Sequence, residues 1–248
     1  MFFFDPMYLC FMIPGLILMG LTSWYVKSAY NKWSKVRNRS GFTGAQAAQR
    51  LIQSASYSTI EGGENLRNVR IMGIGGDLTD HYDPRDKTLK LSPGVANLPS
   101  VASVAIAAHE LGHALQDAEG YFPMRLRTAF VPMVNLGSNL GWILILLGMF
   151  LYNFTRSDFG VTVAWIGVLA FATGAIFALL TLPVEFNASA RAKRLLVESG
   201  IIMGEDEQRG VNNVLNAAAL TYVAGLVTAL LQLLYYVLLV GGLGRRRD

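Results

Sequence analysis

Five consecutive residues, His109, Glu110, Leu111, Gly112 and His113, form the pattern HExxH. On an α-helix, residues four apart lie about 40° apart around the axis and about 6 Å apart along it, so both imidazoles can bind one metal ion. Glu110 is rotated by about 100° from His109. Its carboxylate therefore lies beside such an ion, where it can accept a proton from a bound water instead of serving as a ligand. The spacing indicates the chemistry of a zinc hydrolase.

The residues around the motif favour a buried helix. The preceding run, Val101 to Ala108, reads VASVAIAA and is small and apolar, whereas a helix on a protein surface would be more polar. The chain has only 3 histidines, and two of them lie in the motif.

A catalytic zinc site usually has three protein ligands and one open position, so a third ligand must come from elsewhere. The candidates are His81, Asp117 and Glu185. Asp117 lies one turn beyond His113, too far from His109 to share an ion, and we expect it to support a ligand instead. Glu185 directly follows a long apolar segment, where an isolated acid needs a functional reason.

The apolar segments determine the class of the protein. The composition is 52% hydrophobic, and four windows contain no charged residue. These windows are Pro6–Val26, Thr128–Thr155, Phe159–Val184 and Gly210–Gly244. Each is longer than the roughly 20 residues that cross a bilayer core. The sequence therefore predicts a polytopic membrane protein, with its single cysteine, Cys10, inside the first span.

This topology supports Glu185 as the third ligand. The second and third spans form a hairpin that returns the chain to the side holding the HExxH helix, so Glu185 can reach the metal. Lysine and arginine residues concentrate in 27–127 and 191–209, which predicts that this side is cytoplasmic. Arg245, Arg246 and Arg247 at the chain end disagree with that orientation. They leave open a re-entrant or surface-lying last helix.

The segment between the first span and the motif is long enough for a small lobe. Residues 43–55 are expected to form an amphipathic helix, residues 67–74 and 88–91 short strands, and residues 83–86 a turn. The predicted fold is mainly α, with about four transmembrane helices and a small α+β zincin-like lobe that carries the HExxH helix. We predict an anchor at 1–28, a catalytic lobe at 29–127, a transmembrane hairpin at 128–183, a helix with the third ligand at 184–209, and a last transmembrane helix with a basic tail at 210–248.

Four segments together carry a resemblance to a known family. They are Leu78–Pro84 (LTDHYDP), Ala107–Ala114 (AAHELGHA), Leu182–Ala192 (LPVEFNASARA) and Ala217–Ala224 (AAALTYVA). In this order the chain resembles the bacterial YugP-type membrane zinc metallopeptidase family over nearly its whole length. The resemblance implies a neutral zinc metallopeptidase in the bacterial plasma membrane, with His109 and His113 as ligands and Glu110 as the base.

The chain is more distantly similar to the HtpX-type and CAAX-prenyl-protease-type gluzincins. Their third ligand is a glutamate in an ExxxD pattern on a later helix, and Ser189 stands here where those families have the aspartate. Ser189, Asp117 and Asn187 are therefore our candidates for groups that orient the ligands. His81, Tyr82 and Arg191 are candidates, in that order, for stabilising the oxyanion.

The predicted function is a zinc-dependent endopeptidase that hydrolyses polypeptides near the cytoplasmic face of the membrane. Zn²⁺ is the expected metal because two imidazoles and a carboxylate suit it. A site-2-type intramembrane protease and a non-catalytic, zinc-stabilised scaffold are the alternatives. Intact Glu110 argues against the scaffold, and Pro93, Asn97 and Pro99 make the stretch before the motif a poor span. The expected partners are the bilayer and a polypeptide, and we expect no nucleic acid. An oligomer or a membrane partner protein stays open.

Overall fold

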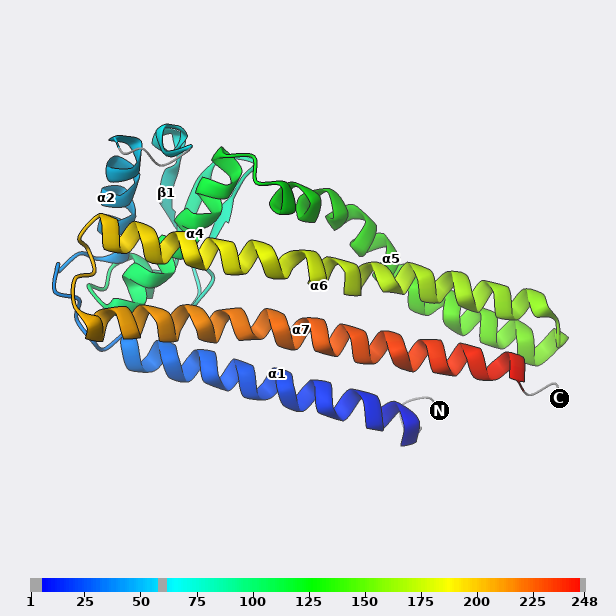
Figure 1. Ribbon diagram of the computed structural model, residues 1–248. Coiled ribbons are helices and arrows are strands. Elements are labelled where there is room, and N and C mark those ends of the chain that lie inside the picture. Colours follow the sequence, from blue (N-terminus) through cyan, green and yellow to red (C-terminus); the bar gives the residue numbers. More distant parts are fainter. Residues whose placement is uncertain (1–5, 58–61, 246–248) are drawn as a thin grey trace. The chain divides into compact units, whose positions relative to one another are not determined.

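The computed structural model describes residues 6–57 and 62–245, and it is mainly helical with one small sheet (Figure 1). In chain order the elements are α1 (Pro6–Trp33), α2 (Gly44–Tyr57), the 3₁₀ helix η2 (Gly63–Asn68), β1 (Arg70–Gly73), β2 (His81–Asp83), β3 (Thr88–Leu91), α3 (Pro93–Ala96), α4 (Val101–Ala118), α5 (Phe122–Thr155), α6 (Asp158–Glu198) and α7 (Glu205–Arg245). The predicted helical class is confirmed. Arg246 and Arg247 lie outside the described residues.

The chain divides into two units, each with its own contacts. One, here called the helical unit, consists of Met1–Leu21, Leu126–Leu182 and Thr221–Asp248. The other, here called the mixed unit, consists of Thr22–Arg125 and Pro183–Leu220. Four helices therefore contribute residues to both units, and the sheet belongs entirely to the mixed unit.

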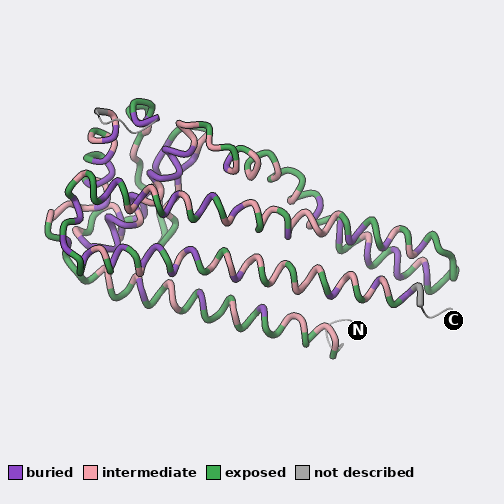
Figure 2. The backbone as a smooth tube through the Cα atoms, in the orientation of Figure 1, coloured by how far each residue is buried: buried purple, intermediate pink, exposed green. Residues whose placement is uncertain are grey.

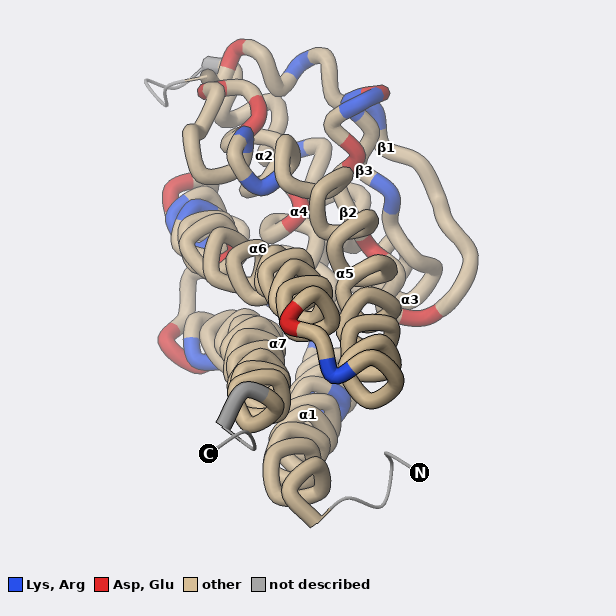
Figure 3. The backbone as a smooth tube through the Cα atoms, turned by 90° about the vertical axis from the view of Figure 1, so that its right-hand side faces the viewer, with Lys and Arg blue, Asp and Glu red and all other residues tan. Residues whose placement is uncertain are grey.

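Within the described residues, four helices are long and apolar enough to cross a membrane. They are α1, α5, α6 and α7, each of which contains one of the predicted windows. Figure 3 shows long stretches of α5, α6 and α7 without a charged residue. Large apolar side chains such as Leu136, Phe154 and Leu169 are exposed in the helical unit. Apolar side chains exposed along several long helices are expected where the surroundings are lipid rather than water.

Glycines allow α5 and α6 to lie very close in the helical unit. A Cβ on Gly141 would stand 2.9 Å from Phe171 Cβ and 3.0 Å from Gly167 O, and one on Gly148 would stand 2.6 Å from Gly160 O. Real Cβ atoms do not approach other atoms so closely. The small residues at positions 137 and 141, four apart, thus form a contact within one chain, as small residues do between membrane helices.

The mixed unit contains a three-stranded sheet in the order β1-β3-β2. β1 pairs with β3 in parallel, with Arg70 opposite Thr88, and β2 pairs with β3 antiparallel, with Tyr82 opposite Leu89. The strand predicted at 88–91 is confirmed. Of the strand predicted at 67–74, only Arg70–Gly73 is extended, since Arg67 and Asn68 belong to η2. β2 was not predicted as a strand, because three residues that end before a proline show too little alternation.

Local capping explains where the helices of the mixed unit begin. Thr43 and Gln46 form a reciprocal capping box at the start of α2, with Thr43 N donating to Gln46 Oε1 at 3.0 Å. Ser100 caps α4 by accepting from Ser103 N at 3.1 Å.

Most of α4 is buried, and in Figure 2 it is mainly purple. It contacts α2, α3, η2, β2 and β3. Fully buried Leu51, Leu66 and Leu111 belong to the core around it. Burying each such side chain contributes about 1.5–3 kcal/mol, so α4 is a rigid element on which to hold functional groups.

Candidate metal centre

The structure brings together the three residues that the sequence predicted as metal ligands. His109 and His113 lie one turn apart on α4, and Glu185 approaches them from α6, all within the mixed unit. Glu185 Oε2 is 3.3 Å from His109 Nε2 and 3.5 Å from His113 Nε2. The ligand atoms of all three lie within 4.8 Å of one another.

These distances fit a zinc ion. Tetrahedral zinc with bonds of about 2.0–2.1 Å holds its ligand atoms about 3.3–3.4 Å apart. Both histidines present Nε2 to the carboxylate, and two imidazoles with one carboxylate are the ligand set of several catalytic zinc sites. The three side chains are only 12%, 11% and 3% exposed, which leaves the metal position largely shielded.

A glycine within the motif permits this approach. A Cβ on Gly112 would stand 2.5 Å from Ala188 O, so any side chain there would push α6 away from α4. Ala188 lies three residues after Glu185 on α6. Gly112 thus fixes how closely the helix that carries Glu185 packs on the helix that carries both histidines.

Glu110 links α4 to β2 through a hydrogen bond. Its Oε2 accepts a hydrogen bond from Tyr82 N at 3.1 Å. Burial raises the pKa of Glu110, and the neighbouring His109 and His113 act in the opposite direction. A raised pKa makes the ionised carboxylate a better proton acceptor, which is what a general base requires.

The side chains of Tyr82 and His81, the two leading candidates for stabilising the oxyanion, have partners outside the three-residue cluster. Tyr82 Oη donates to Asp117 Oδ2 at 2.8 Å. Burial and this hydrogen bond raise the pKa of the Tyr82 phenol, so it stays protonated at neutral pH. His81 Nδ1 lies 2.9 Å from Thr79 O. Neither side chain belongs to the cluster of His109, His113 and Glu185, and their catalytic roles stay predictions.

The three predicted supporting residues have different contacts. Ser189 Oγ lies 3.2 Å from His109 Nδ1, which places it against the first histidine. Asn187 Oδ1 accepts from Arg191 Nε at 2.6 Å and from Gln116 Nε2 at 2.9 Å. Arg191 also pairs with Glu119 and is thereby held in place by two partners. Asp117 contacts Tyr82 as described above.

Sequence reasoning missed Gln116. Its side chain is fully buried, and its amide lies 3.0 Å from His113 Nδ1. The signal was its position three residues after His113, which puts both on one helix face, but a glutamine at that spacing is common on ordinary helices.

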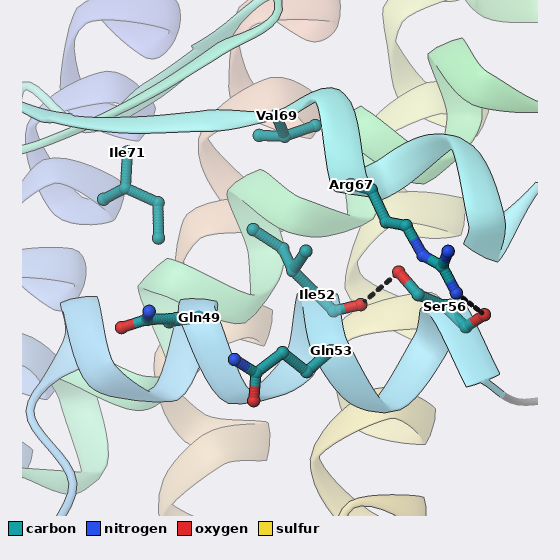
Figure 4. Close-up of a pocket in the computed structure, with 7 residues that line it drawn as sticks. All are labelled: Gln49, Ile52, Gln53, Ser56, Arg67, Val69 and Ile71. Atoms are coloured by element: carbon teal, nitrogen blue, oxygen red, sulfur yellow. Dashed lines mark hydrogen bonds between the residues drawn. The ribbon is translucent and has the colours of Figure 1, made fainter.

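A groove of about 540 Å³ lies apart from this cluster (Figure 4). It is lined by Gln49, Ile52, Gln53 and Ser56 of α2, Arg67 of η2, and Val69 and Ile71 at β1. None of the lining residues is His109, His113 or Glu185, so the groove is a separate feature from the candidate metal centre.

Comparison with known proteins agrees with this geometry. Residues 8–241 match the family described as "Putative neutral zinc metallopeptidase". The chain is 40% identical over 232 residues to "Putative membrane protease YugP" of Bacillus subtilis (strain 168), covering 92% of this chain and 96% of that protein. No solved structure matches it significantly. The match over nearly the whole chain, together with the four apolar helices, makes this a multi-pass membrane protein that belongs to the neutral zinc metallopeptidase family.

Proposed function

We propose that the protein is a membrane-embedded zinc endopeptidase in which His109, His113 and Glu185 bind the metal and Glu110 is the general base. The observation that carries this proposal is the convergence of two imidazole Nε2 atoms on one carboxylate oxygen, at 3.3 and 3.5 Å, on the helix that also carries Glu110. The family description and the membrane-protease relative support the same reaction class.

Zinc bound at this centre would polarise the scissile carbonyl and lower the pKa of the attacking water. Glu110 takes the proton from that water at its carboxylate and later delivers it to the leaving amine. The Tyr82 backbone N–H donates to Glu110 Oε2 and so helps to hold the carboxylate in place. The surrounding buried residues of α4 exclude bulk solvent and strengthen these electrostatic contacts.

The polypeptide substrate is proposed to lie along β2. Tyr82 stands opposite Leu89 in the sheet, yet its N–H donates to Glu110 and not to β3. The side of β2 that is turned away from β3 therefore faces the candidate metal centre. The Tyr82 N–H is already donated to Glu110, so an extended chain on this side would pair with the Tyr82 backbone carbonyl. Pairing through the backbone gives weak sequence preference.

We place the active site on the cytoplasmic side of the bacterial cell membrane. The basic residues near the spans concentrate in 27–127 and 191–209, and such residues favour the cytoplasmic flanks of membrane helices. A site-2-type intramembrane protease is less favoured, because α4 is not among the described helices that can span a membrane.

The test is peptide or casein cleavage by the detergent-purified full chain and its Glu110→Gln variant. Loss of a general base reduces the rate about 10²–10⁴-fold, so we expect at least about a 100-fold loss with zinc retained. Glu198→Gln on α6 is the matched control, since Glu198 is an exposed partner of Arg194. Equal cleavage by wild type and Glu110→Gln, or zinc binding without any cleavage by wild type, would refute the proposed function.

A further inference from the structure

Gln116 is a buried amide with all of its polar atoms engaged. Its side chain is 0% exposed and lies on α4 beside the turn of α6 that carries Glu185. Nε2 donates to Val184 O at 2.8 Å and to Asn187 Oδ1 at 2.9 Å, and Oε1 lies 3.0 Å from His113 Nδ1. A buried amide is costly unless its donors and acceptors are paired, and these three contacts pair it.

The neighbours of this amide permit only one orientation. Val184 O is a backbone carbonyl and can only accept. Asn187 Oδ1 accepts from the guanidinium of Arg191, which can only donate, so that atom of Asn187 must be the oxygen. Rotating the Gln116 amide by 180° would direct its oxygen at two acceptors. Oε1 therefore faces His113, and the assignment follows from donor chemistry rather than from any assumed hydrogen position.

This orientation determines which nitrogen of His113 carries a proton. Gln116 Oε1 is an acceptor only, so the contact of 3.0 Å requires a hydrogen on His113 Nδ1. In the neutral ring, Nε2 then carries no proton and faces Glu185, at the position where the metal is proposed. An imidazole binds a metal through the nitrogen whose lone pair is available, and the hydrogen bond at the other nitrogen sets which one that is.

We propose that Gln116 is the positioning residue that holds His113 in its metal-binding tautomer and ties it to the turn of α6 that carries Glu185. Val184 and Asn187, the two acceptors of the amide, flank Glu185 in sequence. One side chain thus fixes both the ring of one ligand and the backbone beside another. The inference rests on the proposed function, because it assumes a metal on His113 and Glu185.

The other histidine has a weaker support. Ser189 Oγ lies 3.2 Å from His109 Nδ1, but a hydroxyl both donates and accepts, so it is compatible with either tautomer of His109. We therefore expect the tautomer of His113 to depend more strongly on Gln116 than the tautomer of His109 depends on Ser189.

The first test reads the tautomer directly. Because the chain has only 3 histidines, labelling them with ¹⁵N gives three imidazoles to observe by NMR in the full chain in lipid vesicles. The His113 signal is identified as the one lost in His113→Gln. We expect a proton on His113 Nδ1 with and without zinc, and a mixture of tautomers in zinc-free Gln116→Leu. An unprotonated Nδ1 in zinc-free wild type would overturn the proposal, whether or not the protein cleaves peptides.

The second test is zinc affinity, measured by competition with a chelator. Loss of such a supporting hydrogen bond typically weakens metal binding about 10–100-fold, and we expect this for Gln116→Leu. Gln53→Leu is the matched control, since Gln53 is exposed on α2 and lies in the groove of Figure 4. Asn187→Ala removes one of the two acceptors of the Gln116 amide and should weaken zinc binding by a smaller factor. This variant replaces Gln116→Leu in the test if Gln116→Leu does not fold.

These outcomes separate the two proposals. Tight zinc binding by wild type with an unchanged affinity in folded Gln116→Leu contradicts the role of Gln116 but not the metal centre. Absence of zinc binding by wild type contradicts the proposed function, whereas the tautomer measurement still decides the role of Gln116.

Discussion

At the scale of single residues, Gly112 shows how the lack of a side chain can decide the distance between two helices. The motif would be equally recognisable with another residue at this position, yet only glycine leaves room for Ala188 O at the observed separation. The short distance from Glu185 to His109 and His113 therefore depends on Gly112, a residue that has no side chain and binds no metal.

Replacing Gly112 by valine should separate α4 from α6. Overpacking of a well-packed site costs about 1–3 kcal/mol of stability. We expect that loss in thermal unfolding, together with zinc affinity weakened by about tenfold or more as Glu185 is displaced. Gly225→Val is the control, because a Cβ at Gly225 meets nothing within 4 Å. Unchanged zinc affinity in a folded Gly112→Val variant would contradict this account of the helix contact.

Asp83 links stability to pH. Hydrogen bonds from the Arg85 side chain, the Arg85 backbone and Lys90 hold the pKa of the Asp83 carboxyl below its usual value of 3.8, although burial opposes them. A carboxyl whose pKa is lower in the folded state stabilises the protein above its unfolded pKa, and this contribution disappears as the pH falls through the folded pKa.

Asp83→Asn should therefore melt at a lower temperature than wild type at pH 7, and the difference should shrink as the pH falls below about 4. Asp86→Asn is a suitable comparison, since Asp86 is 43% exposed and 3.9 Å from its partner Lys90. A difference in melting temperature that stays constant from pH 7 to pH 3 would disagree with the role given to Asp83.

The sequence was sufficient to predict those residues of the candidate site whose proximity follows from the geometry of a single helix. His109, Glu110 and His113 share one helix face by their spacing, and the predicted hairpin returned Glu185 to the same side. Gln116 was missed because its significance depends on Val184 and Asn187, which are distant in sequence. No local pattern distinguishes a glutamine that orients a ligand from one that is exposed on a helix.

At the scale of elements, the helices are longer than the apolar windows that predicted them. The window Thr128–Thr155 lies in α5, which begins at Phe122, and Phe159–Val184 lies in α6, which ends at Glu198. Charged residues end an apolar window, but they do not end a helix. The turn that carries Glu185 and Ser189 is thus part of the same helix, α6, as the third span.

The glycines between α5 and α6 should be needed for the hairpin. Gly148→Leu would place a large side chain where a Cβ already stands 2.6 Å from Gly160 O. We expect a lower melting temperature in detergent, by several degrees for a cost of about 1–3 kcal/mol. Gly20→Leu is the control, because a Cβ at Gly20 meets nothing within 4 Å and leucine suits a lipid-facing position. Equal melting of the two variants would argue against close packing in the hairpin.

At the scale of the whole molecule, the four long apolar helices and the family membership agree on a multi-pass membrane protein. The side of the membrane is a separate question, which the distribution of basic residues addresses. Cys10 is the only cysteine, so its removal gives a background in which single new cysteines can be labelled.

In a Cys10→Ala background, we expect Ser157→Cys, between α5 and α6, to react with a membrane-impermeant maleimide added to intact cells. Ser199→Cys, just after α6, should react only after the membrane is permeabilised, because we place the end of α6 on the cytoplasmic side with 191–209. The reverse labelling would show that the metal centre faces away from the cytoplasm.

The central claim is that His109, His113 and Glu185 form one zinc site, and the zinc content of the purified chain tests it most directly. Wild type and the exposed control Glu198→Ala should each retain about one zinc per chain after dialysis, and Glu185→Ala should lose it because two imidazoles alone bind zinc weakly. Retention of one zinc by Glu185→Ala at wild-type affinity would contradict the assignment of Glu185, and absence of zinc from wild type would contradict the metal centre itself.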